Sequence, residues 1–160
     1  MTWILFLALA QAAAPTQIER GEARFFDAAK GCGACHSLKG KGTAVGPDLK
    51  EMSRLPPRAI AMAVRSTVTQ YVQVVKLKSG EQFPTMPPKD NATEIYDLSK
   101  MPPAAIKATK ADVASTSANN DWKHPAVGMK LSPDELADLV AYIRFAGANN
   151  RQPVSPEDVR

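Results

Sequence analysis

The spacing of apolar and charged residues predicts an amphipathic helix near each end of the chain. Between Ile18 and Lys30, Ala and Phe residues alternate with charged residues as they would in an amphipathic helix, which packs one side against a core. Near the other end, Ser132 is a favoured N-cap, Pro133 suits the first helical position, and acidic residues follow. The apolar stripe ends at Gly147, which we expect to be the C-cap. Two such helices bury their stripes by crossing each other.

The middle of the chain becomes strand-like after a third predicted helix at residues 57–67. We expect residues 70–114 to form a β-rich insert, followed by a polar loop at residues 115–120. Within the insert, short segments carry the β-branched or alternating pattern of strands: residues 71–77, 93–98 and 105–109.

The N-terminal segment has the features of a signal peptide. Residues 1–14 carry no charged side chain, and their apolar run is shorter than the roughly 20 residues that span a bilayer. Small residues favour cleavage after Ala12 or after Ala14. We therefore expect one domain at residues 15–150, a flexible charged tail at residues 151–160, and no stable membrane span after cleavage.

Both cysteines of the chain lie in one short motif. The stretch Gly-Cys-Gly-Ala-Cys-His places Cys32, Cys35 and His36 in the C-x-x-C-H pattern of covalent haem attachment. Two thiols on one helical turn reach the two vinyl groups at one edge of a porphyrin, while the adjacent imidazole binds the iron. Gly31 and Gly33 suit backbone that lies against a flat macrocycle. The motif therefore predicts one covalently bound haem c.

Three other uses of a cysteine pair are weaker. A disulfide framework in an exported protein normally has several pairs at wide spacing. A zinc site needs further ligands, and the chain offers only one more Cys or His, His124. A thioredoxin-like pair follows a strand in a βαβ unit, whereas Cys32 follows a helical pattern.

The two ends of the chain together resemble the class I cytochrome c family. The resemblance rests on three stretches: Gly21 and Phe25 before the motif, Gly46-Pro47-Asp48-Leu49 after it, and residues 136–143 near the C-terminus. It implies a mainly α, cytochrome c-like helical fold around one covalent haem, here with a small β-hairpin insert. It also implies that the carbonyl of Pro47, or its neighbour, accepts the Nδ1 proton of His36. The insert resembles that of a bacterial subgroup of haem-binding domains.

The sixth iron ligand is expected in the loop before the last helix, where this family usually carries a Met. His124 is followed by a proline and occupies approximately that place, whereas Met129, in the same loop, is close to Ser132. Spacing therefore favours His124, with Met129 second. Met86 and Met101 also precede prolines but fall in or beside the insert, and Met is more often core filler. Two imidazole ligands predict a lower potential than one imidazole and one thioether.

These features favour an electron carrier in the periplasm or otherwise exported. The formal charge of +4 favours a redox partner with an acidic docking surface, while the dispersed Lys and Arg residues argue against nucleic acid. The alternative is a haem enzyme or a gas or redox sensor with a displaceable sixth ligand, for which no distal His/Arg pair is visible. A haem-free thiol oxidoreductase is a third possibility.

Overall fold

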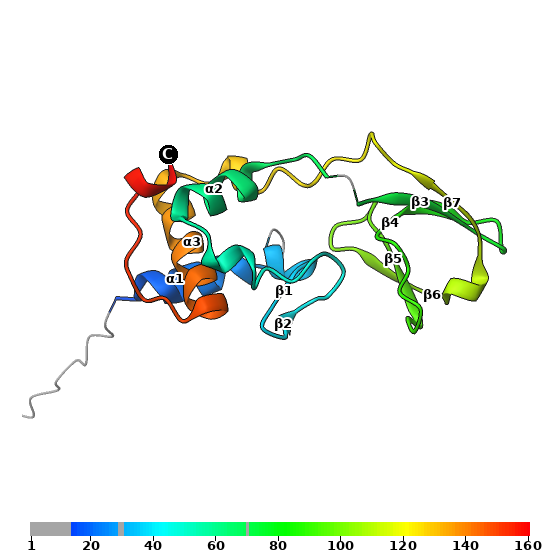
Figure 1. Cartoon of the computed structure of the whole chain (residues 1–160), viewed down its shortest axis with the longest axis horizontal. Helices are drawn as coiled ribbons and strands as arrows, with labels where there is room; N and C mark the ends of the chain where they lie inside the picture. Colours follow the sequence, from blue (N-terminus) through cyan, green and yellow to red (C-terminus); the bar gives the residue numbers. More distant parts are fainter. Residues whose placement is uncertain (1–13, 29–30, 70) are drawn as a thin grey trace, which may run out of the picture.

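The computed structural model describes residues 14–28, 31–69 and 71–160, so the predicted signal peptide lies outside it apart from Ala14. Figure 1 shows helices gathered at one end of the molecule and most strands at the other, joined by two lengths of chain. We call these the helical lobe and the strand lobe, the latter being residues 73–118. No helix in the described ranges is long and apolar enough to cross a membrane.

The helical lobe is built on the three helices that the sequence predicts: α1 (Gln17–Phe25), α2 (Pro57–Arg65) and α3 (Pro133–Ala148). Thr16 and Ser132 cap α1 and α3 through reciprocal bonds with a Glu three residues later, each such cap contributing about 1 kcal/mol. The apolar faces of the helices meet in one core that includes Phe25, Ile60 and Leu136, all fully buried. The helix predicted to reach Lys30 ends at Phe25 instead.

Gly21 makes the crossing of α1 and α3 possible. A Cβ at this position would collide with the carbonyl oxygen of Asp138 and lie 2.7 Å from the Cβ of Tyr142. The two helix backbones therefore approach more closely than any side chain at residue 21 would permit.

We expect Gly21→Ala to lower the free energy of unfolding by about 3 kcal/mol, because the added methyl group meets backbone that cannot move aside. Denaturant titration of the purified protein measures the change. Gly80→Ala is the control: its site has open space but a φ of +98°, so it should cost only about 1–2 kcal/mol. Equal losses in the two variants would contradict close helix packing at Gly21.

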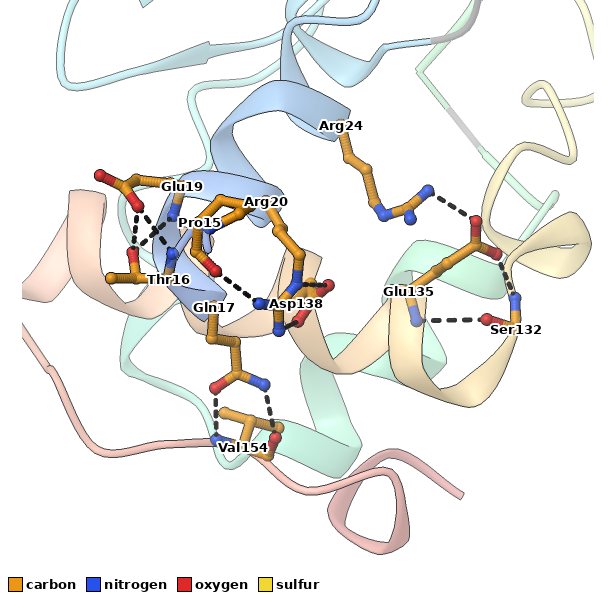
Figure 2. Close-up of polar contacts among 10 residues, drawn as sticks. All are labelled: Pro15, Thr16, Gln17, Glu19, Arg20, Arg24, Ser132, Glu135, Asp138 and Val154. Atoms are coloured by element: carbon orange, nitrogen blue, oxygen red, sulfur yellow. Dashed lines mark hydrogen bonds and ion pairs between the residues drawn. The ribbon is translucent and has the colours of Figure 1, made fainter. Parts of the chain in front are cut away.

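Polar contacts fix the same crossing from its solvent side, as Figure 2 shows. The guanidinium of Arg20 donates to both carboxylate oxygens of Asp138, each at 2.8 Å. Arg24 pairs with Glu135 at 2.8 Å, one turn further along α1. The side chain of Asp138 is only 8% exposed, so its two-pronged pairing with Arg20 holds α1 in one orientation over α3.

The C-terminus of α3 differs from the expected Gly147 cap. The helix continues through Ala148, and Asn149 takes the left-handed cap conformation at a φ of 55°. Gly147 is buried within the helix, where a Cβ would collide with the side chain of Ser53. Glycine is required there by packing, while Asn tolerates the left-handed cap.

The C-terminal tail, expected to be flexible at residues 151–160, is packed in the structure. Val154 and Val159 are 3% and 0% exposed and belong to the helical core. Gln17 accepts from the amide of Val154 and donates to its carbonyl, and Arg65 donates to the carbonyl of Val159. Burial of these two valines therefore packs the tail against the helices, although charged residues lie between them.

The strand lobe contains a three-stranded antiparallel sheet and a separate hairpin. The sheet has the order β4 (Gln82–Thr85), β3 (Gln73–Leu77), β7 (Val113–Ala118), and the hairpin pairs β5 (Glu94–Asp97) with β6 (Ala104–Lys107). Val75, Phe83 and Ile95 form the centre of a core of its own. The lobe is thus larger than the small hairpin insert expected from the sequence.

Most predicted strands are found, with one correction. The segments at residues 71–77, 93–98 and 105–109 correspond to β3, β5 and β6. Residues 115–118, expected in a polar loop, belong to β7, which pairs with β3 along its length. Backbone hydrogen bonds to β3 hold this polar strand although its side chains are mostly exposed.

Candidate functional site

Cys32 begins a 3-10 helix, Cys32–Ala34, that follows α1, and Cys35 is the C-cap of this helix. The amides of Cys35 and His36 both donate to the carbonyl of Cys32, at 3.1 and 2.8 Å. Gly33 packs on Phe26, where a Cβ would lie 2.7 Å from the ring. The turn is therefore tight, and it holds the thiols and His36 in one short piece of chain.

Burial raises the pKa of the Cys32 thiol to about 11 and also raises the pKa of Cys35. Thiols that exchange disulfides have a pKa below the usual value. Both thiols here are protonated at neutral pH, which disfavours the thioredoxin-like reading of the motif.

The segment Gly46-Pro47-Asp48-Leu49, which follows the C-x-x-C-H motif, orients the ring of His36. The amides of Val45 and Gly46 donate to the carbonyl of Cys35 at 3.1 and 2.7 Å, which folds this segment back over the motif. As a result the Nδ1–H of His36 donates to the carbonyl oxygen of Pro47 at 2.8 Å. The proton is thereby held on Nδ1, and Nε2 is left with a lone pair for a metal.

Neighbouring residues keep this bond in place. The hydroxyl of Ser37, on β1 (Ser37–Leu38), donates to Asp48 at 2.8 Å, and this bond is the main reason for the lowered pKa of Asp48. β1 turns back tightly into β2 (Lys41–Gly42). Gly46 lies against the imidazole, where a Cβ would be 2.8 Å from Cε1 of His36. Any larger residue at position 46 would displace the ring.

His124 lies in the loop before α3 and faces the same space as His36. Its amide donates to the carbonyl of Thr67 at 2.9 Å, and its Nδ1–H donates to the carbonyl of Pro125 at 3.0 Å. Burial, and secondarily the nearby His36, lower the pKa of His124. The ring is therefore neutral at pH 7, with its Nε2 free.

Trp122 ties the loop of His124 to the strand lobe. Its indole N–H donates to the carbonyl of Leu98 at 3.3 Å, and its ring stands edge-on to His124 at 6.3 Å between centroids. Its backbone amide also donates to the side-chain oxygen of Asn119 at 2.9 Å. The orientation of His124 is thus set by both lobes.

The two imidazole rings have the spacing of two ligands on one metal ion. Their centroids are 5.9 Å apart, with an angle of 38° between the ring planes. A metal-bound imidazole nitrogen lies about 2 Å from the metal, and the ring centroid lies about 1 Å behind that nitrogen, so two opposed ligands have centroids about 6 Å apart. His36 and His124 therefore fit a common iron.

A cavity of about 570 Å³ surrounds these residues, within the range of cofactor sites. The helical lobe contributes Cys32, Cys35 and both histidines, with apolar side chains from α2 and α3. The strand lobe contributes a second group of residues, Met86, Leu98, Lys100, Met101 and Pro103. The cavity is therefore a site between the two lobes, largely apolar as a porphyrin requires.

The candidate methionines fall into two groups. Met129 is 58% exposed and is not among the residues that line the cavity. Met86 and Met101 do line it, although Met101 is 50% exposed. Of the ligands considered from the sequence, His124 lies with its ring centroid 5.9 Å from that of His36. Lys100 also lines the cavity. It was not predicted from the sequence, because no local motif marks it.

Comparison with known proteins gives one family. The family model for Cytochrome c matches residues 18–146, which covers both lobes and the motif. No curated protein matches the chain.

Proposed function

Because the chain belongs to the cytochrome c family, we propose that it is an exported electron carrier whose single haem lies in the cavity between the lobes. It is a class I c-type cytochrome and binds haem c covalently. Members of this family are generally electron carriers. We propose which residues hold the haem, that the protein is exported, and which kind of redox partner it has.

In this proposal Cys32 and Cys35 would hold the haem through two thioether bonds, and His36 and His124 would each supply an imidazole to the iron. The carbonyl of Pro47 fixes the ring of His36 through the 2.8 Å bond to Nδ1. The carbonyl of Pro125 does the same for His124 at 3.0 Å. Such bonds also increase the basicity of the free nitrogen, which strengthens its donation to a metal.

The observation that carries the proposal is the closeness of the two histidine rings, both of which line the cavity. Their centroid separation of 5.9 Å leaves room for one iron and no bound substrate between them. The haem supplies an iron that alternates between the ferric and ferrous states. The chain's own contribution is to hold both imidazoles through backbone anchors, so that little rearrangement accompanies a change of valence. This is what a carrier needs and what an enzyme with an open position lacks.

Export and docking complete the proposal. The charge-free apolar segment at residues 1–14 supports a signal peptide and hence export. The formal charge of +4 supports a partner with an acidic docking surface, whose encounter with this protein is then faster at low ionic strength.

Carbon monoxide separates the carrier from the haem enzyme or sensor. We expect the dithionite-reduced protein to keep its spectrum unchanged under carbon monoxide at neutral pH, because both axial positions are held by imidazoles. Visible absorption spectroscopy measures this. A stoichiometric carbon monoxide complex, formed without denaturant, would instead identify a displaceable sixth ligand and favour the enzyme or sensor.

A further inference from the structure

Lys100 is an unusual member of the cavity lining. It lies between β5 and β6, and apart from the two histidines it is the one residue with an ionisable cationic side chain among those that line the cavity in the described ranges. Within the described residues, the ammonium group of Lys100 makes no hydrogen bond or ion pair. Lys89 and Lys107, its neighbours along the sequence of the strand lobe, do not line the cavity. Lys100 is exposed, so its positive charge is available to an anion bound in the cavity.

The chemistry of haem supplies such an anion at a defined edge. The vinyl groups that react with thiols and the two propionate carboxylates are on opposite edges of the porphyrin. Cys32 and Cys35 lie in the helical lobe, directly after α1. Figure 1 shows the strand lobe extending away from α1 and α3. A haem attached to these thiols would therefore carry its carboxylates at the edge farther from Cys32 and Cys35.

Hydroxyl groups line the cavity near the start of the strand lobe. Ser66, Thr69 and Tyr71 are lining residues in the chain between α2 and β3. The oxygens of Ser66 and Thr69 accept from the amides of Val68 and Tyr71, at 3.3 and 3.4 Å, so their own protons remain available to donate. Hydroxyl donors and one cation thus all belong to the lining of the cavity.

We propose that Lys100 is the counter-ion of a haem propionate, so that the strand lobe binds the carboxylate edge of the haem. This inference rests on the proposed function, since it places the haem in the cavity between the lobes. It assigns the strand lobe a role: Leu98 receives the indole bond of Trp122 at 3.3 Å, and Lys100, two residues later, contacts the cofactor. The lobe then touches both the loop of the sixth ligand and the haem itself.

The test is the midpoint potential of Lys100→Gln. A positive charge near the haem stabilises the reduced state, so its removal should lower the ratio of reduced to oxidised protein about threefold at a fixed applied potential. At 59 mV per tenfold change for one electron, this is a fall of about 28 mV. Lys100→Arg keeps the charge and should stay within a few millivolts of the wild type. Resonance Raman spectra should show a shift of the propionate bending band in Lys100→Gln alone.

Lys107→Gln is the matched control, because it removes the same charge from β6 at a residue outside the cavity lining. A potential and propionate band that change in Lys100→Gln but not in Lys107→Gln support the inference. Equal behaviour of the two variants overturns it, while leaving the proposed function intact if both keep their low-spin haem. If the wild-type protein contains no haem, the proposed function and this inference both fail. The absence of haem is detected before any redox titration is begun.

Discussion

Replacing His124 by Ala is expected to turn a protein that does not bind carbon monoxide into one that binds it stoichiometrically. The ring centroid of His124 lies 5.9 Å from that of His36, and alanine leaves nothing in its place that can bind iron. We expect the low-spin absorption bands of the ferric protein to give way to high-spin bands. Absorption spectra of the ferric and ferrous variant, with and without carbon monoxide, measure both effects.

Two further variants control this experiment. Met129→Ala should leave the spectra unchanged, because Met129 is 58% exposed and lies outside the cavity lining. His124→Met should restore a sixth ligand and raise the midpoint potential by on the order of 100 mV, within the roughly 0.8 V range set by axial ligands. The ligand assignment fails if His124→Ala keeps the low-spin bands or if Met129→Ala loses them.

Replacing both Cys32 and Cys35 by Ala is expected to abolish covalent haem attachment completely. These are the only thiols in the chain, so no other residue can form a thioether. Intact-mass spectrometry of protein made with a c-type maturation system should give the polypeptide plus one haem for the wild type. The double variant should give the polypeptide alone after denaturing chromatography.

The single variants refine this result. Cys32→Ala and Cys35→Ala each leave one thiol next to the cavity, so a haem bound through one thioether remains possible in each. A pyridine haemochrome spectrum shifted to longer wavelength than that of the wild type would report the single bond. Haem that stays covalently bound in the double variant would contradict the attachment site.

The sequence predicted the helical lobe well because its signals are local. The Ser132 cap, a first-turn proline and apolar stripes indicate where helices form without knowledge of the rest of the chain. The C-x-x-C-H motif is equally local. The Gly147 cap was wrong because a glycine can be required either by a left-handed backbone or by a close neighbour, and the neighbour, Ser53, is distant in sequence.

The strand lobe and the outer part of the site were harder to predict. The polar segment of β7 carries no apolar alternation, and only its pairing with β3 makes it a strand. The packing of Val154 and Val159 depends on a surface formed by α1 and α2. Lys100 reaches the cavity through the fold of the whole strand lobe, so no pattern in the sequence around it marks its position.

The central claim is that one haem lies between His36 and His124, attached to Cys32 and Cys35. The absorption spectrum of the purified ferric protein, extended into the far red, tests it most directly. We predict sharp low-spin haem bands and no thioether-to-iron charge-transfer band. A charge-transfer band from Met ligation, a high-spin spectrum, or a colourless protein from cells with a working maturation system would contradict the account.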